Sequence, residues 1–82
     1  MKEKETPAHL SARNRLPGKV TALKTDGLMA QVELQVGDNH IVAIITAEAA
    51  EEMGLQVGMD AVALIKSTSV MILTPTGGIA GL

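Results

Sequence analysis

The sequence contains no cysteine and no phenylalanine, tyrosine or tryptophan. The lack of cysteine excludes disulfide bonds, thiolate zinc sites and cysteine nucleophiles. Two histidines are too few for a metal site built from histidine alone. The lack of aromatic rings removes the base-stacking side chains on which most single-strand nucleic-acid binders depend. These absences leave few ways for the chain to hold a metal ion or a nucleic acid.

Charge is also scarce, because seven Lys and Arg residues face nine Asp and Glu residues and leave a formal net charge of −2. A slightly acidic chain is a poor binder of the phosphate backbone of nucleic acids. The longest apolar runs, residues 41–45 and 61–65, are five residues long, whereas about 20 apolar residues are needed to cross a bilayer. The first residues lack the apolar stretch of a signal peptide. We therefore expect a cytoplasmic chain with neither a nucleic-acid nor a membrane partner.

Aliphatic residues and methionine supply the hydrophobic content, which reaches 46% of the 82 residues. This composition is globular, and the length fits one small domain. Domains of this size seldom gain more than about 3–5 kcal/mol from their own core. Aromatic side chains usually contribute the largest burial per residue, and none is present here. We therefore expect association of identical copies to supply part of the stability.

Alternating apolar and polar residues predict five strands. The expected ranges are residues 16–24, 29–36, 41–45, 61–66 and 70–73. In the second range the alternation is strict, with Ala30, Val32, Leu34 and Val36 on the apolar face, which is typical of a half-buried strand. The third range is apolar on both faces, so we expect it to be buried on both.

Two dipeptides indicate how the first strand is bounded and placed. Asp26-Gly27, between the first two expected strands, predicts a hairpin turn. Pro17-Gly18 predicts a bulge or a sheet edge near the start of the first strand, because proline cannot donate a hydrogen bond to a strand ladder.

A short helix is predicted over residues 47–53, between the third and fourth strands. The Thr46 hydroxyl can cap the free N–H groups of its first turn, and Gly54 suits a left-handed stop. Five strands with a helix between the third and fourth are the usual order of an OB-type barrel. We therefore expect a mostly β fold, a five-stranded OB-like barrel with one short helix. Residues 11–73 would form this domain, between a polar N-terminal arm over residues 1–10 and a flexible C-terminal tail over residues 74–82.

The sequence has none of the common catalytic or nucleotide-binding motifs. It lacks a G-x-S-x-G elbow, a Walker-type loop and an H-E-x-x-H pair. Glu51 and Glu52 occupy adjacent helix positions, whose side chains do not face each other. We therefore expect a binding protein that is not an enzyme and coordinates no metal ion directly.

Two polar clusters have the chemistry of a small-anion site. They are Ser11-Ala12-Arg13-Asn14 and Lys66-Ser67-Thr68-Ser69. Hydroxyls, backbone N–H groups and a fixed cation are the groups that bind a small anion. The helix start at Thr46 and Ala47 is a weaker third group of donors. On composition alone, Ser, Asn and Thr are more typical of turns than of binding sites.

Three motifs in order resemble the molbindin (Mop domain) family, which is related to the TOBE domain. They are Ser11-Ala12-Arg13-Asn14 followed by Leu16-Pro17-Gly18-Lys19-Val20, then Ile44-Ile45-Thr46 leading into Glu51-Glu52-Met53-Gly54-Leu55, and last Val57-Gly58 followed by residues 63–73. The resemblance spans residues 11–73, and three ordered motifs are much more specific than one.

The resemblance implies a small cytoplasmic OB-like domain that binds molybdate or tungstate, for storage or homeostasis, with no organic cofactor. It also implies a homohexamer, arranged as a trimer of dimers, with oxyanions held between subunits. A second hypothesis keeps the fold but changes the role to a free-standing regulatory or accessory domain that acts on a protein partner in molybdate sensing or transport. A third, an OB-fold nucleic-acid binder, is disfavoured by the absent aromatics and the negative charge.

The resemblance also assigns site residues. Contacts to the oxyanion would come from Ser11, Arg13 and the backbone around Ala12 and Asn14, and from Lys66, Ser67 and Thr68 of another subunit, with Thr46 and Ala47 as weaker candidates. Two positions depart from the family pattern. Arg15 stands where many relatives have an uncharged polar residue, and Pro17 stands where lysine is frequent, so a backbone N–H is lost there.

Overall fold

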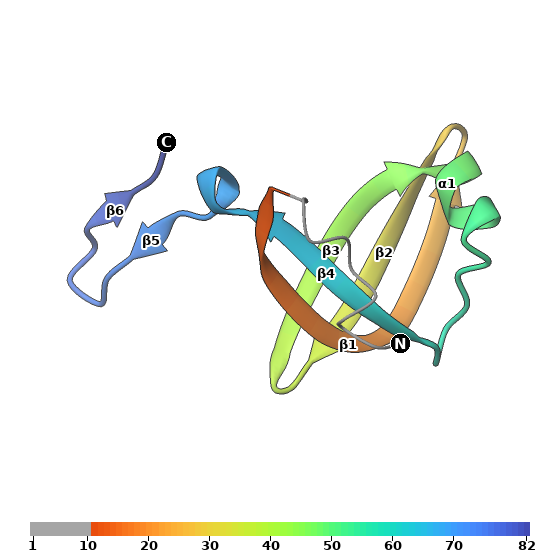
Figure 1. Cartoon of the computed structure of the whole chain (residues 1–82), viewed down its shortest axis with the longest axis horizontal. Coiled ribbons are helices and arrows are strands. Elements are labelled where there is room, and N and C mark those ends of the chain that lie inside the picture. The colour runs from red at the N-terminus through yellow and green to blue at the C-terminus, as the bar shows by residue number, and fades with distance from the viewer. Residues whose placement is uncertain (1–10) are drawn as a thin grey trace.

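A four-stranded antiparallel sheet in the order β3-β2-β1-β4 makes up most of the structure (Figure 1). This computed structural model describes residues 11–82, so the predicted N-terminal arm lies outside the described residues. The elements are β1 (Ala12–Asp26), β2 (Met29–Val36), β3 (Asn39–Thr46), α1 (Ala47–Glu52), β4 (Asp60–Lys66), the 3-10 helix η2 (Ser67–Ser69), β5 (Ile72–Leu73) and β6 (Ile79–Ala80). The predicted mostly β, OB-like fold with one short helix between the third and fourth strands is confirmed.

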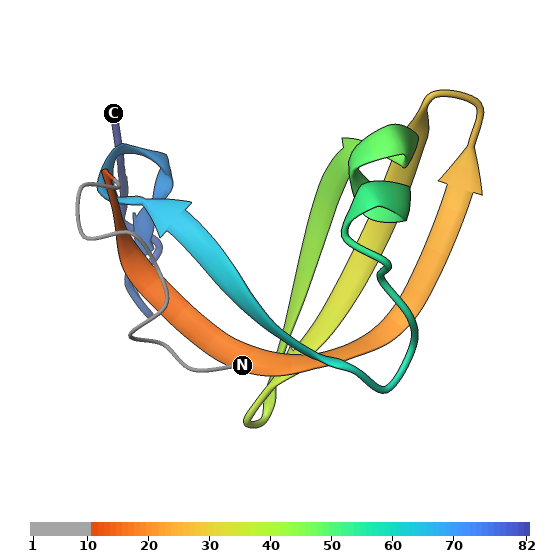
Figure 2. The ribbon, with the colours of Figure 1, turned by 45° about the vertical axis from the view of Figure 1, so that its right-hand side comes forward.

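Strand β1 is a long, bent strand that changes partner at its middle (Figure 2). Its first half pairs with β4 and its second half with β2, and Lys19 is aligned with a residue of each. The strand starts at Ala12, four residues before the predicted start, so Pro17 lies inside it. Pro17 is tolerated because the first half of β1 pairs on one side only.

Two hairpin turns connect the first three strands, and the first forms at Asp26-Gly27, where the sequence predicts it. Gly27, with φ +60°, lies in the turn between β1 and β2, and Gly37, with φ +58°, lies in the turn between β2 and β3. This left-handed conformation costs glycine little, since it has no Cβ. Strand β2 then buries Ala30, Val32 and Leu34 and leaves the alternating polar side chains outside, as the pattern predicts.

The core is small and lies between the two halves of the bent sheet. Val20, Val32 and Leu34 form its buried centre. The segment after α1 closes one side, where the Val20 N–H donates to the Met59 carbonyl at 2.9 Å and the Gly58 N–H donates to the Val20 carbonyl at 2.8 Å.

The prediction that residues 41–45 are buried on both faces is wrong. In β3, Ile41 and Ile45 pack against the core, whereas Val42 and Ile44 on the other face are exposed. Within residues 11–82 nothing covers that second face, where Val42 is 52% and Ile44 is 57% exposed.

The predicted helix is confirmed with its caps. The Thr46 hydroxyl oxygen accepts a hydrogen bond from the Ala49 N–H at 3.0 Å, and Gly54 follows the helix with φ +61°. Within residues 11–82, no helix is long and apolar enough to span a membrane.

The barrel is not closed, because the fifth strand does not join the sheet. Residues of β5 pair with β6 in a separate two-stranded hairpin, which projects to the left in Figure 1, away from α1. The sequence predicts a loose tail after Leu73, but the chain instead turns through residues 74–78, where the Thr74 N–H donates to the Gly78 carbonyl at 2.9 Å. We call residues 70–82 the C-terminal hairpin segment.

Candidate functional site

The start of β1 and the end of β4 lie side by side in one copy of the chain. Ala12 is aligned with Lys66, and Asn14 with Ile65. The Asn14 side-chain N–H donates to the Ile65 carbonyl at 3.1 Å and ties the two strands together. The fold therefore brings together the two polar clusters that are far apart in the sequence, within a single chain rather than only across subunits.

Arg13 occupies a β-bulge that the sequence does not reveal. The pairing steps from Ala12–Lys66 to Asn14–Ile65, so Arg13 is an extra residue on β1 with no aligned partner on β4. A bulge bends the strand and redirects the extra side chain. Among residues 11–82 no strand lies on the other side of this half of β1, and Arg13 is exposed. The sequence-based strand, which starts at residue 16, missed this feature.

The second cluster forms the single turn of η2. Ser67, Thr68 and Ser69 are exposed, and none of their hydroxyls bonds to another side chain or backbone group among residues 11–82. The turn is closed by the Val70 N–H, which donates to the Ser67 carbonyl at 3.4 Å. Its hydroxyl groups are thus available to an external acceptor.

Positive charge is concentrated where the start of β1 lies beside the end of β4. Arg13, Arg15 and Lys66 lie on the paired β1 and β4 segments, and residues 11–18 and 61–82 contain no Asp or Glu. Three carboxylates, those of Glu48, Glu51 and Glu52, lie on α1 at the other end of the bent sheet (Figure 2). The donor-rich end therefore carries three cations although the whole chain has a formal charge of −2.

Arg15 is a further candidate that the sequence did not place in the site. It lies two residues beyond the bulge, aligned with Leu64, and its Nε is buried without a hydrogen-bond partner. A buried guanidinium N–H without an acceptor is uncommon. Its departure from the family pattern was the only signal in the sequence that could have drawn attention to it.

Thr46 and Ala47 lie elsewhere in the same copy. They are at the α1 end of β3, where Thr46 is aligned with Met29. The Ala47 N–H already donates to the Leu28 carbonyl at 2.8 Å, so it is not free for an anion. The structure does not bring these two residues to Arg13 and Lys66.

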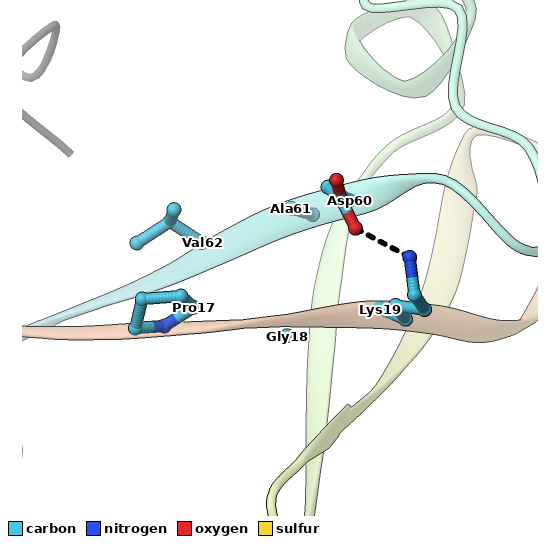
Figure 3. Close-up of a pocket in the computed structure, with 6 residues that line it drawn as sticks. All are labelled: Pro17, Gly18, Lys19, Asp60, Ala61 and Val62. Carbon is cyan, nitrogen blue, oxygen red and sulfur yellow. Dashed lines mark hydrogen bonds and ion pairs between the residues drawn. The ribbon is translucent and has the colours of Figure 1, made fainter. Parts of the chain in front are cut away.

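A surface hollow lies at the other end of the β1–β4 pairing, where the middle of β1 meets the start of β4 (Figure 3). It has a volume of about 380 Å³ and contains an ion pair, in which Lys19 Nζ donates to Asp60 Oδ1 at 2.6 Å. The hydrogen bond from Lys19, helped by its charge, lowers the pKa of the Asp60 carboxyl. The cation is thus neutralised by an ionised carboxylate, and this hollow is a poor anion site.

A metal site is the other kind of site to consider. No group of three His, Cys, Asp or Glu side chains among residues 11–82 is placed to hold a metal ion. The end formed by Ser11–Arg15 and Lys66–Thr68 is therefore the candidate site, which we call the cationic end.

Comparison with known proteins gives the family. The TOBE domain model matches residues 10–72. Molybdenum-pterin-binding protein 1 of Clostridium pasteurianum is 48% identical over 65 residues, which cover 78% of this chain and 96% of that protein.

Solved structures agree in fold. MopII from Clostridium pasteurianum is 45% identical with a TM-score of 0.74, over 79% of this chain and 98% of that one. ModG, described as a cytoplasmic molybdate-binding protein, is 35% identical with a TM-score of 0.73, over 83% of this chain and 48% of that one. Sequence and fold together show that the chain belongs to the TOBE domain family and, within it, to the molbindin (Mop) group.

Proposed function

We propose that this chain is a cytoplasmic binder of molybdate or tungstate that stores or buffers the oxyanion and catalyses no reaction. The observation that carries the proposal is the cationic end, where hydroxyls, a bulged backbone and three cations lie on segments, residues 11–18 and 61–69, that contain no Asp or Glu. The names of the relatives, which are molybdenum-pterin-binding and molybdate-binding proteins, support the same ligand.

The chemistry of the site favours a fully deprotonated tetrahedral anion. Molybdate carries two negative charges and no proton at neutral pH, so a site made only of donors satisfies all its oxygens. Monohydrogen phosphate would place its hydroxyl against a donor, an unmade bond that costs about 1–3 kcal/mol when buried. Charge-assisted hydrogen bonds from Arg13 and Lys66 would supply the strongest contacts. No organic cofactor is needed for these contacts.

Calorimetric titration with molybdate tests the site. We expect Arg13→Ala and Lys66→Ala each to weaken binding by about tenfold or more, since a hydrogen bond to a charged group contributes about 1.5–3 kcal/mol. Lys24→Ala is the matched control, because Lys24 is an exposed cation on β1 at the α1 end. Circular dichroism checks that each variant keeps its fold. Unchanged affinity in both site variants would refute the assignment.

We further propose that the working form is a homo-oligomer, a hexamer arranged as a trimer of dimers. Among residues 11–82 of one copy only six apolar residues are buried, and they include three alanines. Many large apolar side chains are exposed instead, over β3, β4 and the C-terminal hairpin segment. Burial of this surface between copies would stabilise the fold, and it would set the cationic ends of different copies close to one another.

Whether the protein stores molybdate or regulates a protein partner is a separate question from which anion it binds. A free-standing regulatory or accessory domain would bind a protein partner only in the presence, or only in the absence, of molybdate. Affinity capture from a cytoplasmic extract with and without molybdate distinguishes the two roles, and we expect no ligand-dependent partner.

A further inference from the structure

We propose that Arg15 is a ligand of the oxyanion site, and that its charge makes the site select a dianion over a monoanion of the same shape. The three sequence motifs do not assign Arg15 to the site. The inference rests on the proposed function, because it concerns the same anion, and it names a residue that determines which charge the bound anion carries.

Arg15 lies on the same face of the paired β1 and β4 segments as Lys66. Arg15 is aligned with Leu64, and aligned residues of neighbouring strands project to the same face. Side chains alternate along a strand, so Lys66, two residues after Leu64, projects to that face as well. Diagonal neighbours of this kind are about 7–8 Å apart, a separation that long side chains can span. The two cations can therefore contact one small anion from two strands.

This shared face is the outer face of the two strands. Pro17 and Val62, the next aligned pair, project to the same side in Figure 3, and alternation places Arg15 on that side too. Leu64 beside it is 45% exposed, whereas Ala63, on the opposite face of β4, packs against the core. An anion can therefore approach the Arg15 guanidinium without entering the core.

The Arg15 guanidinium is held in place but has an unused donor. Its Nε is buried and has no hydrogen-bond partner among residues 11–82, which is uncommon for a buried N–H group. Residues 11–18 and 61–69 contain no carboxylate, and the carboxylate of Asp60 on the outer face is bonded to Lys19 at 2.6 Å. A tetrahedral oxyanion would supply acceptors that suit the planar fork of guanidinium donors. A guanidinium that is already held in place loses little freedom when it binds.

The charge of Arg15 affects dianions and monoanions differently. Coulomb attraction is proportional to both charges, so a cation attracts a dianion about twice as strongly as a monoanion at the same distance. Removal of an anion from water opposes binding, and this cost is larger for the dianion. A site with too few cations therefore favours the monoanion, and each added cation shifts the preference towards the dianion.

Calorimetric titration with two anions tests the proposal. Molybdate and perrhenate are tetrahedral oxyanions of similar size with two charges and one charge, and perrhenate affinity can be measured by displacement of molybdate. We expect Arg15→Gln to weaken molybdate binding about tenfold and perrhenate binding about threefold, since half the anion charge halves the free energy that is lost. Arg15→Lys keeps the charge and should keep the ratio of the two affinities. Lys24→Gln, which removes an exposed cation at the α1 end, is the matched control and should leave both affinities at the values of the parent.

The outcomes separate this inference from the proposed function. If Arg15→Gln weakens both anions equally, or weakens neither, the charge of Arg15 does not select the anion and the inference is overturned. Molybdate binding that still depends on Arg13 and Lys66 would then continue to support the proposed function. Unchanged molybdate affinity in Arg13→Ala, Lys66→Ala and Arg15→Gln alike would refute both.

Thermal unfolding distinguishes a ligand from a residue that only stabilises the fold. Because the Nε of Arg15 has no partner among residues 11–82, Arg15→Gln should unfold at the same temperature as the parent in anion-free buffer. Added molybdate should raise the unfolding temperature of the parent more than that of the variant, since the parent binds it more tightly. A lower unfolding temperature without anion, together with an unchanged ratio of affinities, would show that Arg15 is structural and would overturn the proposal.

Discussion

Gly18 is the residue on which the bend of β1 depends most directly. It lies where β1 crosses the end of β2, and a Cβ built on it would meet the Gln35 backbone oxygen and lie 2.8 Å from Val36 Cγ2. Any side chain would push the two strands apart at the point where β1 changes partner. The requirement is steric, because the backbone of Gly18 is not in the left-handed region.

We expect Gly18→Ala to lower the free energy of unfolding by about 1–3 kcal/mol, the usual cost of overpacking a closed site. Urea unfolding followed by circular dichroism measures it. Gly37→Asn is the contrasting variant, because Gly37 has open space around its Cβ position and a φ of +58° that asparagine tolerates. Equal stability of Gly18→Ala and the parent would show that the strands separate freely.

Residue identities alone predicted the donor chemistry of the site but not its geometry. Ser, Arg, Lys and Thr side chains are recognisable as anion ligands wherever they occur. Their meeting depends on the pairing of Ala12 with Lys66, a contact between distant parts of the chain that no local pattern encodes. The bulge at Arg13 and the unpaired Nε of Arg15 arise from the same pairing, so they became visible only in the structure.

At the scale of elements, α1 shows how local signals specify a short helix. Six residues are too few to be stable without support, and the Thr46 cap provides one bond at 3.0 Å to the Ala49 N–H. The cap residue, the alanine-rich run and the terminal glycine are all contiguous in the sequence. A prediction from sequence was therefore correct for this helix.

Thr46→Ala should lower the free energy of unfolding by about 0.5–2 kcal/mol, the usual cost of removing an N-cap hydroxyl, and Thr46→Ser should restore it. Molybdate affinity, measured by calorimetry on the folded variant, should not change, because Thr46 lies at the α1 end of the sheet. A loss of affinity with no loss of stability would instead assign Thr46 to an oxyanion site shared with a neighbouring copy.

The strands were predicted less accurately than the helix. The alternation in β2 and the Asp26-Gly27 turn are local features, and both were correct. The start of β1 was missed because its first residues are held by β4, and polar residues there do not look like a strand. The position of β5 was missed for a related reason: its apolar pattern specifies a strand but not the partner with which that strand pairs.

At the scale of the whole molecule, the small core and the exposed apolar surface have the same cause. A chain without aromatic side chains cannot bury much area by itself. The structure leaves uncovered the C-terminal hairpin segment and an apolar groove between β3 and β4, lined by Ile41, Ile45 and Ala63 among others. The sequence predicted association from this deficit. It could not predict which apolar surfaces stay exposed in one copy, because these depend on the open edge between β3 and β4.

The separation of charge along the bent sheet has a consequence for the rate at which the anion arrives. A dianion approaching a body of net charge −2 is repelled at long range, but near the cationic end it meets three positive groups while the α1 carboxylates are distant. The Debye length shrinks from about 30 Å at 0.01 M salt to about 8 Å at 0.15 M. Local steering would therefore make the association rate constant fall as salt is added, whereas steering by net charge would make it rise.

Stopped-flow fluorescence can measure whether the association rate constant rises or falls with salt. Ser69→Trp would introduce the single tryptophan of the chain, on η2, as the fluorescent probe. We expect the rate constant for molybdate to fall with ionic strength, and the dependence to flatten when Arg15→Gln is added. An increase with salt would mean that the cationic end does not guide the anion. A weakly acidic protein would in that case capture a dianion against its own field, whereas the arrangement of β1 and β4 predicts that it draws the anion in.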